Sequence, residues 1–129
     1  MGSKNVAKVF ENWPGLNDKP KLALIWMSSQ ARDDDRPPVF WGQREELAHA
    51  IGVGPDNADA AGRAVRRALK DLQNAGAITW SGQAYRGVGS SYALCLDPTV
   101  RWRPTGSGRD ITWILDNRDP PEASVDNPP

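Results

Sequence analysis

Cysteine and histidine are nearly absent from this chain, because its 129 residues include one of each, Cys95 and His49. A single cysteine excludes a disulfide within the chain and any zinc site built from several thiolates, which agrees with a reducing compartment. His49 falls on the flank of a short predicted helix with no second ligand nearby, so a surface role explains it better. We expect neither a metal site nor a cofactor.

The sequence has no long hydrophobic run. Its longest, residues 22–27, is far shorter than the roughly 18 apolar residues that a membrane-spanning helix needs. The N-terminal stretch MGSKNVAKVF lacks the apolar segment of a signal peptide. The length suits one domain with a real core, and we expect a cytoplasmic protein without a membrane partner.

The sequence also offers little for catalysis. Asp33, Asp34 and Asp35 could bind a cation, but consecutive residues do not converge on one point, so a solvated loop explains them better. The stretch GVGSS at 87–91 lacks the Lys-Ser/Thr ending of a phosphate-binding loop and lies in a predicted hairpin. Cys95 falls inside an apolar strand, where it behaves as a small core residue. We expect no enzymatic activity.

Positive and negative charges balance over the whole chain, with 16 of each, so composition alone indicates no polyanionic partner. The balance is uneven along the sequence, because residues 59–96 hold five cations against two carboxylates, a local charge of +3. These residues are Arg63, Arg66, Arg67, Lys70 and Arg86, against Asp59 and Asp71. Such a local excess on one face of a neutral molecule is typical of an electrostatic footprint for nucleic acid.

Apolar patterns predict the elements in the first third of the chain. The apolar residues between 6 and 13 follow the i, i+3, i+4, i+7 spacing of a short helix, which Pro14 ends. This helix would form an N-terminal arm over residues 1–17. Asp18 can cap a second, nearly all-apolar helix that carries Pro20 in its first turn. The stretch VFW then suits a strand of about three residues.

Two further helices and a hairpin follow. Gly42 and Gly52 bracket a short helix, and a longer helix is expected over 58–75, with the sequence NAG as its C-cap. The stretches AITW and SSYALCL are strand-like and flank a glycine-rich connection, which predicts a hairpin. Residues 98–129 are expected to form an extension with one strand, at 111–115, and a disordered tail.

This order of helix, short strand, two helices and hairpin resembles the winged helix-turn-helix, with residues 18–97 as that domain. The stretches ARDDDRPPVFWGQREELAHAIGV, AVRRALKDLQNAGAI and SSYALCL resemble the winged-helix domains of phage and plasmid replication initiators and phage DNA-binding regulators. The resemblance covers residues 21–97, about three-fifths of the chain. It implies an α+β, mostly helical fold. The sequence departs from the family in a longer loop before the third helix, and in Gly42, where the family usually has Ser.

The resemblance also implies a DNA-binding surface. In winged-helix domains the third helix enters the major groove, so the cations spaced i, i+3, i+4 and i+7 along residues 58–75 become candidate contacts. Arg63 and Arg66 suit bases, because the arginine fork can bond guanine O6 and N7. Arg67 and Lys70 suit phosphates.

The wing and the second helix supply further candidates. The wing residues suited to the DNA backbone or minor groove are Tyr85, Arg86, Ser90 and Ser91. For the serines, hydroxyls that bond their own backbone at a turn are the alternative. Gln43 and Arg44 open the second helix, where backbone N–H groups and a basic side chain could hold a phosphate.

Six tryptophans are many for a chain of this length. Four are expected to pack in or against the core: Trp13, Trp26, Trp41 and Trp80. Trp102 and Trp113 belong to the extension, where an extra strand over the domain is the simpler interpretation. A partner surface, such as one for a second copy of the chain in a homodimer, is the alternative.

The sequence therefore predicts a sequence-specific double-stranded DNA-binding protein of phage or mobile-element type, acting in transcription regulation or replication initiation. A protein-interaction module directed at a host protein is the alternative, favoured by zero net charge and by the tryptophans of the extension. Binding of single-stranded nucleic acid through exposed tryptophans is a third and weaker hypothesis.

Overall fold

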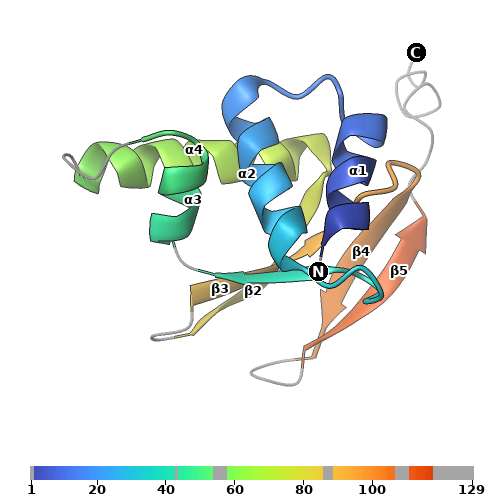
Figure 1. Ribbon diagram of the computed structural model, residues 1–129. Helices are drawn as coiled ribbons and strands as arrows, with labels where there is room; N and C mark the ends of the chain where they lie inside the picture. Colours follow the sequence, from blue (N-terminus) through green and yellow to red (C-terminus); the bar gives the residue numbers. More distant parts are fainter. Residues whose placement is uncertain (1, 43, 54–57, 86–88, 107–110, 118–129) are drawn as a thin grey trace, which may run out of the picture.

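The computed structural model describes residues 2–42, 44–53, 58–85, 89–106 and 111–117, which form an α+β fold of four helices and two small antiparallel sheets (Figure 1). The helices are α1 (Ser3–Asn12), α2 (Asp18–Gln30), α3 (Arg44–Ala50) and α4 (Ala58–Ala75). The strands are β1 (Val39–Gly42), β2 (Ile78–Tyr85), β3 (Gly89–Leu94), β4 (Val100–Thr105) and β5 (Thr112–Asn117). The predicted bounds of α4 are confirmed, whereas the tail expected to be disordered lies outside the described residues from 118 onward.

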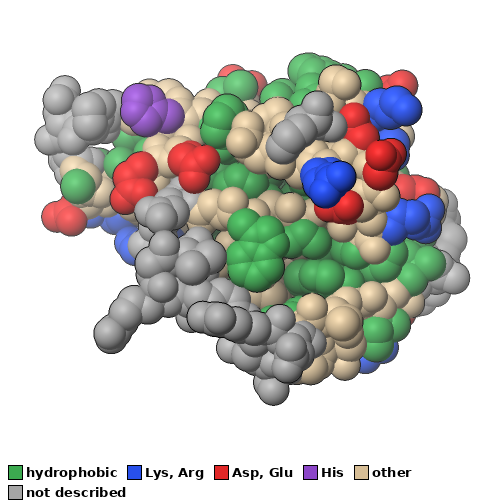
Figure 2. Space-filling model, turned by 60° about the horizontal axis from the view of Figure 1, so that its bottom comes forward, with side chains coloured by type: hydrophobic (Ala, Val, Ile, Leu, Met, Phe, Trp, Pro, Cys, Tyr) green, Lys and Arg blue, Asp and Glu red, His purple; other side chains and the backbone are tan. Residues whose placement is uncertain are grey.

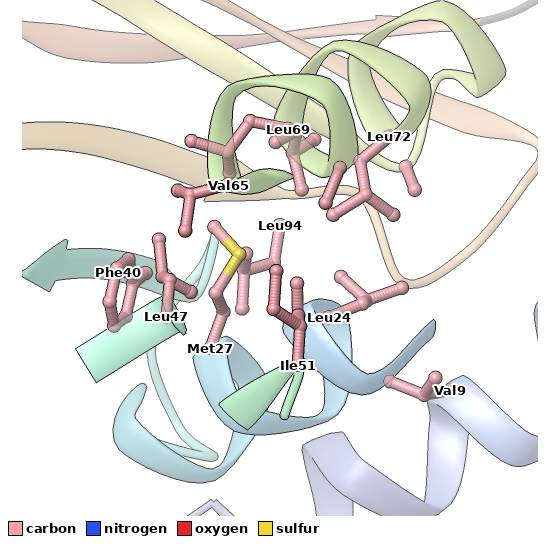
Figure 3. Packing of buried hydrophobic residues seen from close by; sticks show 14 of the residues in the cluster. Val9, Leu24, Met27, Phe40, Leu47, Ile51, Val65, Leu69, Leu72 and Leu94 are labelled. Atoms are coloured by element: carbon pink, nitrogen blue, oxygen red, sulfur yellow. The ribbon is translucent and has the colours of Figure 1, made fainter. Parts of the chain in front are cut away.

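The hydrophobic core lies where α2, α3 and α4 meet one face of the first sheet (Figure 3). Leu24 and Met27 of α2 are fully buried there. The buried residues of α4 stand at 65, 68, 69 and 72, the spacing that places side chains on one face of a helix. Phe40 of β1 and Leu94 of β3 close the core from the sheet. Burial of these apolar side chains is the main favourable term in the stability of the fold.

Two glycines end the helices of this core, as the sequence predicts. Gly52 follows α3 with φ +82° and Gly76 follows α4 with φ +84°, a backbone region that favours glycine. After α4, Gly76 donates its N–H to the carbonyl of Gln73 and Ala77 donates to that of Leu72. The same pair of hydrogen bonds closes α3, so both helix ends satisfy carbonyls that would otherwise be unpaired.

The first sheet has the strand order β1-β3-β2, and its central strand has buried residues on both faces. Phe40, Tyr92 and Trp80 lie directly opposite one another across the three strands, so their side chains share the face toward the helices. Ala93 and Cys95 alternate to the other face and are also buried. Cys95 is therefore the core residue that the sequence predicts.

The extension contains a hairpin of two strands, where one strand at 111–115 was expected. β4 alternates half-buried residues at 100, 102 and 104 with exposed ones at 101, 103 and 105, and it lies against β2. The strand was not predicted because β4 contains arginine at 101 and 103 and proline at 104, so it has no continuous apolar run. Asp97 sets the turn before β4, and hydrogen bonds from the Thr99 N–H and hydroxyl, at 2.9 and 2.7 Å, hold the pKa of Asp97 below its ordinary value.

α1 is fastened at both ends to the rest of the molecule. At its start, the backbone N–H of Asn5 donates to the carboxylate of Asp33 (3.0 Å), which thereby caps the first turn. At its end, Asn12 Nδ2 donates to the carbonyl of Leu96 (2.9 Å) and Trp13 Nε1 donates to that of Cys95 (3.0 Å). The aspartate run is thus part structural, because Asp33 anchors the arm while Asp34 and Asp35 are exposed.

Two of the tryptophans expected in the core are exposed instead. Trp41 has an exposed fraction of 54% and Trp80 of 41%. Successive strand residues point to opposite faces, so once Phe40 takes the core position on β1, Trp41 cannot. Trp80 stands on the edge strand β2, two residues beyond the buried Ile78. Trp13 and Trp26 do pack against the core, as expected.

Gly42 ends β1 rather than capping the following helix. A Cβ atom at this position would overlap the buried ring of Phe40, two residues earlier on the same face of the strand. This contact favours glycine over serine at position 42. Any side chain here would have to displace a core aromatic ring.

We predict that Gly42→Ser lowers the free energy of unfolding by about 1–3 kcal/mol, the usual cost of overpacking a core. Urea denaturation followed by circular dichroism measures the change. Gly15→Ser is the matched control, because a Cβ atom at Gly15 meets nothing within 4 Å, and it should stay within about 0.5 kcal/mol of the parent. Equal midpoints for the two variants would contradict the assigned packing of Phe40.

Candidate nucleic-acid interface

The outer surface of α4 carries the candidate contacts. Burial of Val65, Leu69 and Leu72 fixes which face of the helix points inward. The side chains on the other side are exposed, and they include all four predicted cations: Arg63, Arg66, Arg67 and Lys70. Among the described residues, none of these four forms an ion pair with a carboxylate. Their charge is therefore available to a partner.

The four cations do not share one direction. Each residue of a helix advances by about 100°, so Arg63, Arg66 and Lys70 fall within an arc of about 60°. Arg67 lies outside this arc, on the side of α4 that meets the start of α2. There it lines a groove of about 360 Å³ together with Asp18 and Asp71. Lys19 also lines this groove, so two cations and two carboxylates balance there, and Arg63, Arg66 and Lys70 are the stronger candidates.

The start of α3 is a poor phosphate site. The whole of Gln43 and the side chain of Arg44 lie outside the described residues, so these two candidates stay predictions. Glu45 and Glu46, however, occupy the first turn of α3 and are exposed. Their negative charge suits the positive end of the helix dipole but repels a phosphate at the same place. His49 is exposed in the last turn of the same helix, in agreement with its expected surface position.

The four wing candidates differ in whether the structure describes them and in how far they are exposed. Arg86 and the side chain of Tyr85 lie outside the described residues, and Ser90 is half-buried. Ser91 has an exposed fraction of 1%, so its hydroxyl cannot reach a phosphate, and its selection as a DNA contact was wrong. The physical reason is its place on the central strand β3, directly opposite Trp41 of β1. Ser90 is less buried than Ser91 because the residue opposite it, Gly42, has no side chain that could cover Ser90.

An exposed apolar surface lies on the face of the molecule that β1 occupies, and it was not predicted from the sequence. Figure 2 shows hydrophobic side chains gathered in the middle of the face that β1 occupies, below a group of acidic side chains. Two tryptophans are among the large exposed apolar residues, and Trp41 is the more exposed of the two. The signal was present in the stretch VFW, because the period of two in a strand cannot bury both Phe40 and Trp41 against the helices.

Over the described residues, His, Cys, Asp and Glu side chains form no group of three that could hold a metal ion. In the same part of the chain, none of the helices combines the length and apolar character needed to span a membrane. No family model matches the chain, and no curated protein or solved structure is detectably similar to it.

We predict that Gly62→Ala stabilises α4 and with it the protein by about 0.5–1 kcal/mol, because a Cβ atom there meets nothing within 4 Å and glycine is entropically costly inside a helix. Thermal denaturation followed at 222 nm would show a higher midpoint. Gly76→Ala is the opposing control, since the positive φ of Gly76 makes it destabilising. A lower midpoint for Gly62→Ala would mean that α4 is not a regular helix at this point.

Proposed function

We propose that this protein binds double-stranded DNA sequence-specifically and without enzymatic activity, in the transcription regulation or replication initiation of a phage or mobile element. The observation that carries the proposal is the exposed cationic face of α4, opposite a fully buried apolar face. The order α2-β1-α3-α4-β2-β3, with β3 between β1 and β2, supports a winged-helix interpretation of the fold. In such a domain α4 is the helix that enters the major groove.

The chemistry of the face suits this role. Arg66 and Arg63 are exposed on the solvent side of α4, and each can donate two hydrogen bonds to one guanine. Lys70, one turn beyond Arg66, suits a phosphate, because an ammonium is a compact point charge without a planar fork. Arg67 would approach a neighbouring phosphate only with Asp18 and Asp71 beside it. Binding should therefore depend most on Arg66 and least on Arg67.

Arg66→Glu is predicted to weaken binding of a cognate duplex by at least about tenfold, since an arginine that reads a base contributes about 1–3 kcal/mol and the new carboxylate also repels DNA. Arg67→Glu should weaken binding less. Fluorescence anisotropy of labelled duplexes, first selected from a random library, measures both effects at two salt concentrations, and binding should fall steeply with salt.

Lys4→Glu is the control for net charge, because Lys4 is exposed on α1 and the substitution changes the charge by the same amount. Circular dichroism should report an unchanged fold for all three variants. Equal losses for Arg66→Glu and Lys4→Glu would reduce the effect to overall charge. Unchanged affinity for Arg66→Glu would remove α4 from the interface.

The exposed apolar face favours a second candidate, a protein-interaction module that binds a host protein. Trp41 is an aromatic anchor of the type enriched in protein interfaces and is 54% exposed, whereas Trp80, 41% exposed, lies on the opposite face of the sheet. This candidate predicts weak DNA contact that salt barely affects, together with a stoichiometric complex that Trp41→Ser disrupts and Arg66→Glu does not. Co-purification from host extract followed by mass spectrometry, with both variants, separates the two candidates.

A further inference from the structure

The β4–β5 hairpin ends in an unpaired strand edge. β5 pairs with β4 along one side from Thr112 to Asn117, and it is the outer strand of a two-stranded sheet. β4, and not β5, lies against β2, so β5 stands at the right-hand border of the molecule in Figure 1. Within the described part of the chain nothing pairs with its other edge. An isolated two-stranded sheet is marginal in water, so this edge would gain from another strand.

The other sheet edges are protected, whereas β5 is not. β1 has only four residues and ends in Gly42, and β2 has a register shift between Trp80 and Ala84. Short length and irregular register are the means by which proteins prevent edge pairing. β5 keeps one continuous register over six residues and contains neither lysine nor proline. Its charged residue, Asp116, forms a diagonal ion pair with Arg103 of β4, whose Nε lies 3.9 Å from the carboxylate.

We propose that β5 pairs with β5 of a second copy of this chain, which joins the two hairpins into one four-stranded antiparallel sheet. The pairing is isologous, so its two-fold axis stands perpendicular to the sheet. Because opposed residues in an antiparallel pair point to the same face, the numbers of any two opposed residues add to an even total. Only registers centred on a residue are allowed, and those nearest the middle of β5 centre on Ile114 or Leu115.

The side chains select the register centred on Ile114. There Ile114 opposes its own copy, and Trp113 opposes Leu115 of the partner twice, so three apolar pairs form across the new interface. Thr112 opposes Asp116, which leaves no like charges face to face. The register centred on Leu115 would instead oppose Ile114 to Asp116, an apolar side chain against a carboxylate. Ile114 and Leu115 are 43% and 45% exposed in the monomer, so both have surface left to bury.

The charges agree with a second copy as the occupant. On the face of the hairpin that carries Ile114, the row across the four strands would be Arg103, Ile114, Ile114 and Arg103, with the two arginines at the outer positions. Each Arg103 keeps its own Asp116. A strand of six residues makes only a small interface, so we expect a dimer with a dissociation constant in the micromolar range.

An introduced cysteine tests the register directly. Ile114→Cys would face its own copy with Cβ atoms about 4.5–5.5 Å apart, close enough for a disulfide after slight adjustment. Mild oxidation at about 100 µM protein should give a covalent dimer, which is resolved on a non-reducing gel. The native Cys95 does not compete, because it is fully buried. Leu115→Cys should cross-link much less, and the reverse order of yields would overturn the Ile114 register.

Sedimentation equilibrium tests the dimer without any covalent bond. The parent should show a monomer–dimer equilibrium, and Ile114→Lys should raise its dissociation constant at least about tenfold, because two lysines would then face each other at the axis. Leu22→Lys is the matched control, since Leu22 is also 43% exposed but lies on α2. A strictly monomeric parent up to about 500 µM, or a loss of the dimer in Leu22→Lys alone, would overturn the proposal.

Discussion

The packing of α4 across α2 is the contact on which the surface of this molecule depends. Val65, Leu69 and Leu72 face Leu24 and Met27 in the core (Figure 3). Since a helix can bury only one face in this way, the same contact fixes the direction of every other side chain on α4. The cations at 63, 66 and 70 point outward because the leucines point inward. A change in this core would therefore also affect the orientation of the proposed DNA-binding face.

The helical part of the fold could be predicted from the sequence because each signal there is local. The apolar stripe of α4 and the glycine after it give its two ends, and Gly52 marks the end of α3 in the same way. The signals act through hydrogen bonds and burial within a few residues, so no distant partner is needed to interpret them. The exposure of the cations could be predicted from the same pattern, since they occupy the positions of α4 that do not belong to the apolar stripe.

The strands were harder to predict, because pairing partners lie far apart in the sequence. Nothing near Ser91 shows that β1 and β2 will flank it, yet that position is what buries its hydroxyl. The alternation in β4 is clear only after β5 and β2 supply two neighbours. Gly42 was predicted to cap a helix. The steric overlap that a side chain at position 42 would make with Phe40 is not apparent from the sequence, because it depends on both residues lying on the same face of a strand. In each case the missing information is tertiary.

The arm and the extension meet on the same few residues of the chain. Asn12 and Trp13 donate to the carbonyls of Leu96 and Cys95, and the turn into β4 begins at the next residue, Asp97. Removing residues 1–17 would leave those two carbonyls without their side-chain partners and would expose the part of the core that Val9 covers. A fragment reduced to the central helices and the first sheet would thus be a damaged molecule. Deletion mapping could mistake its instability for the loss of a binding site.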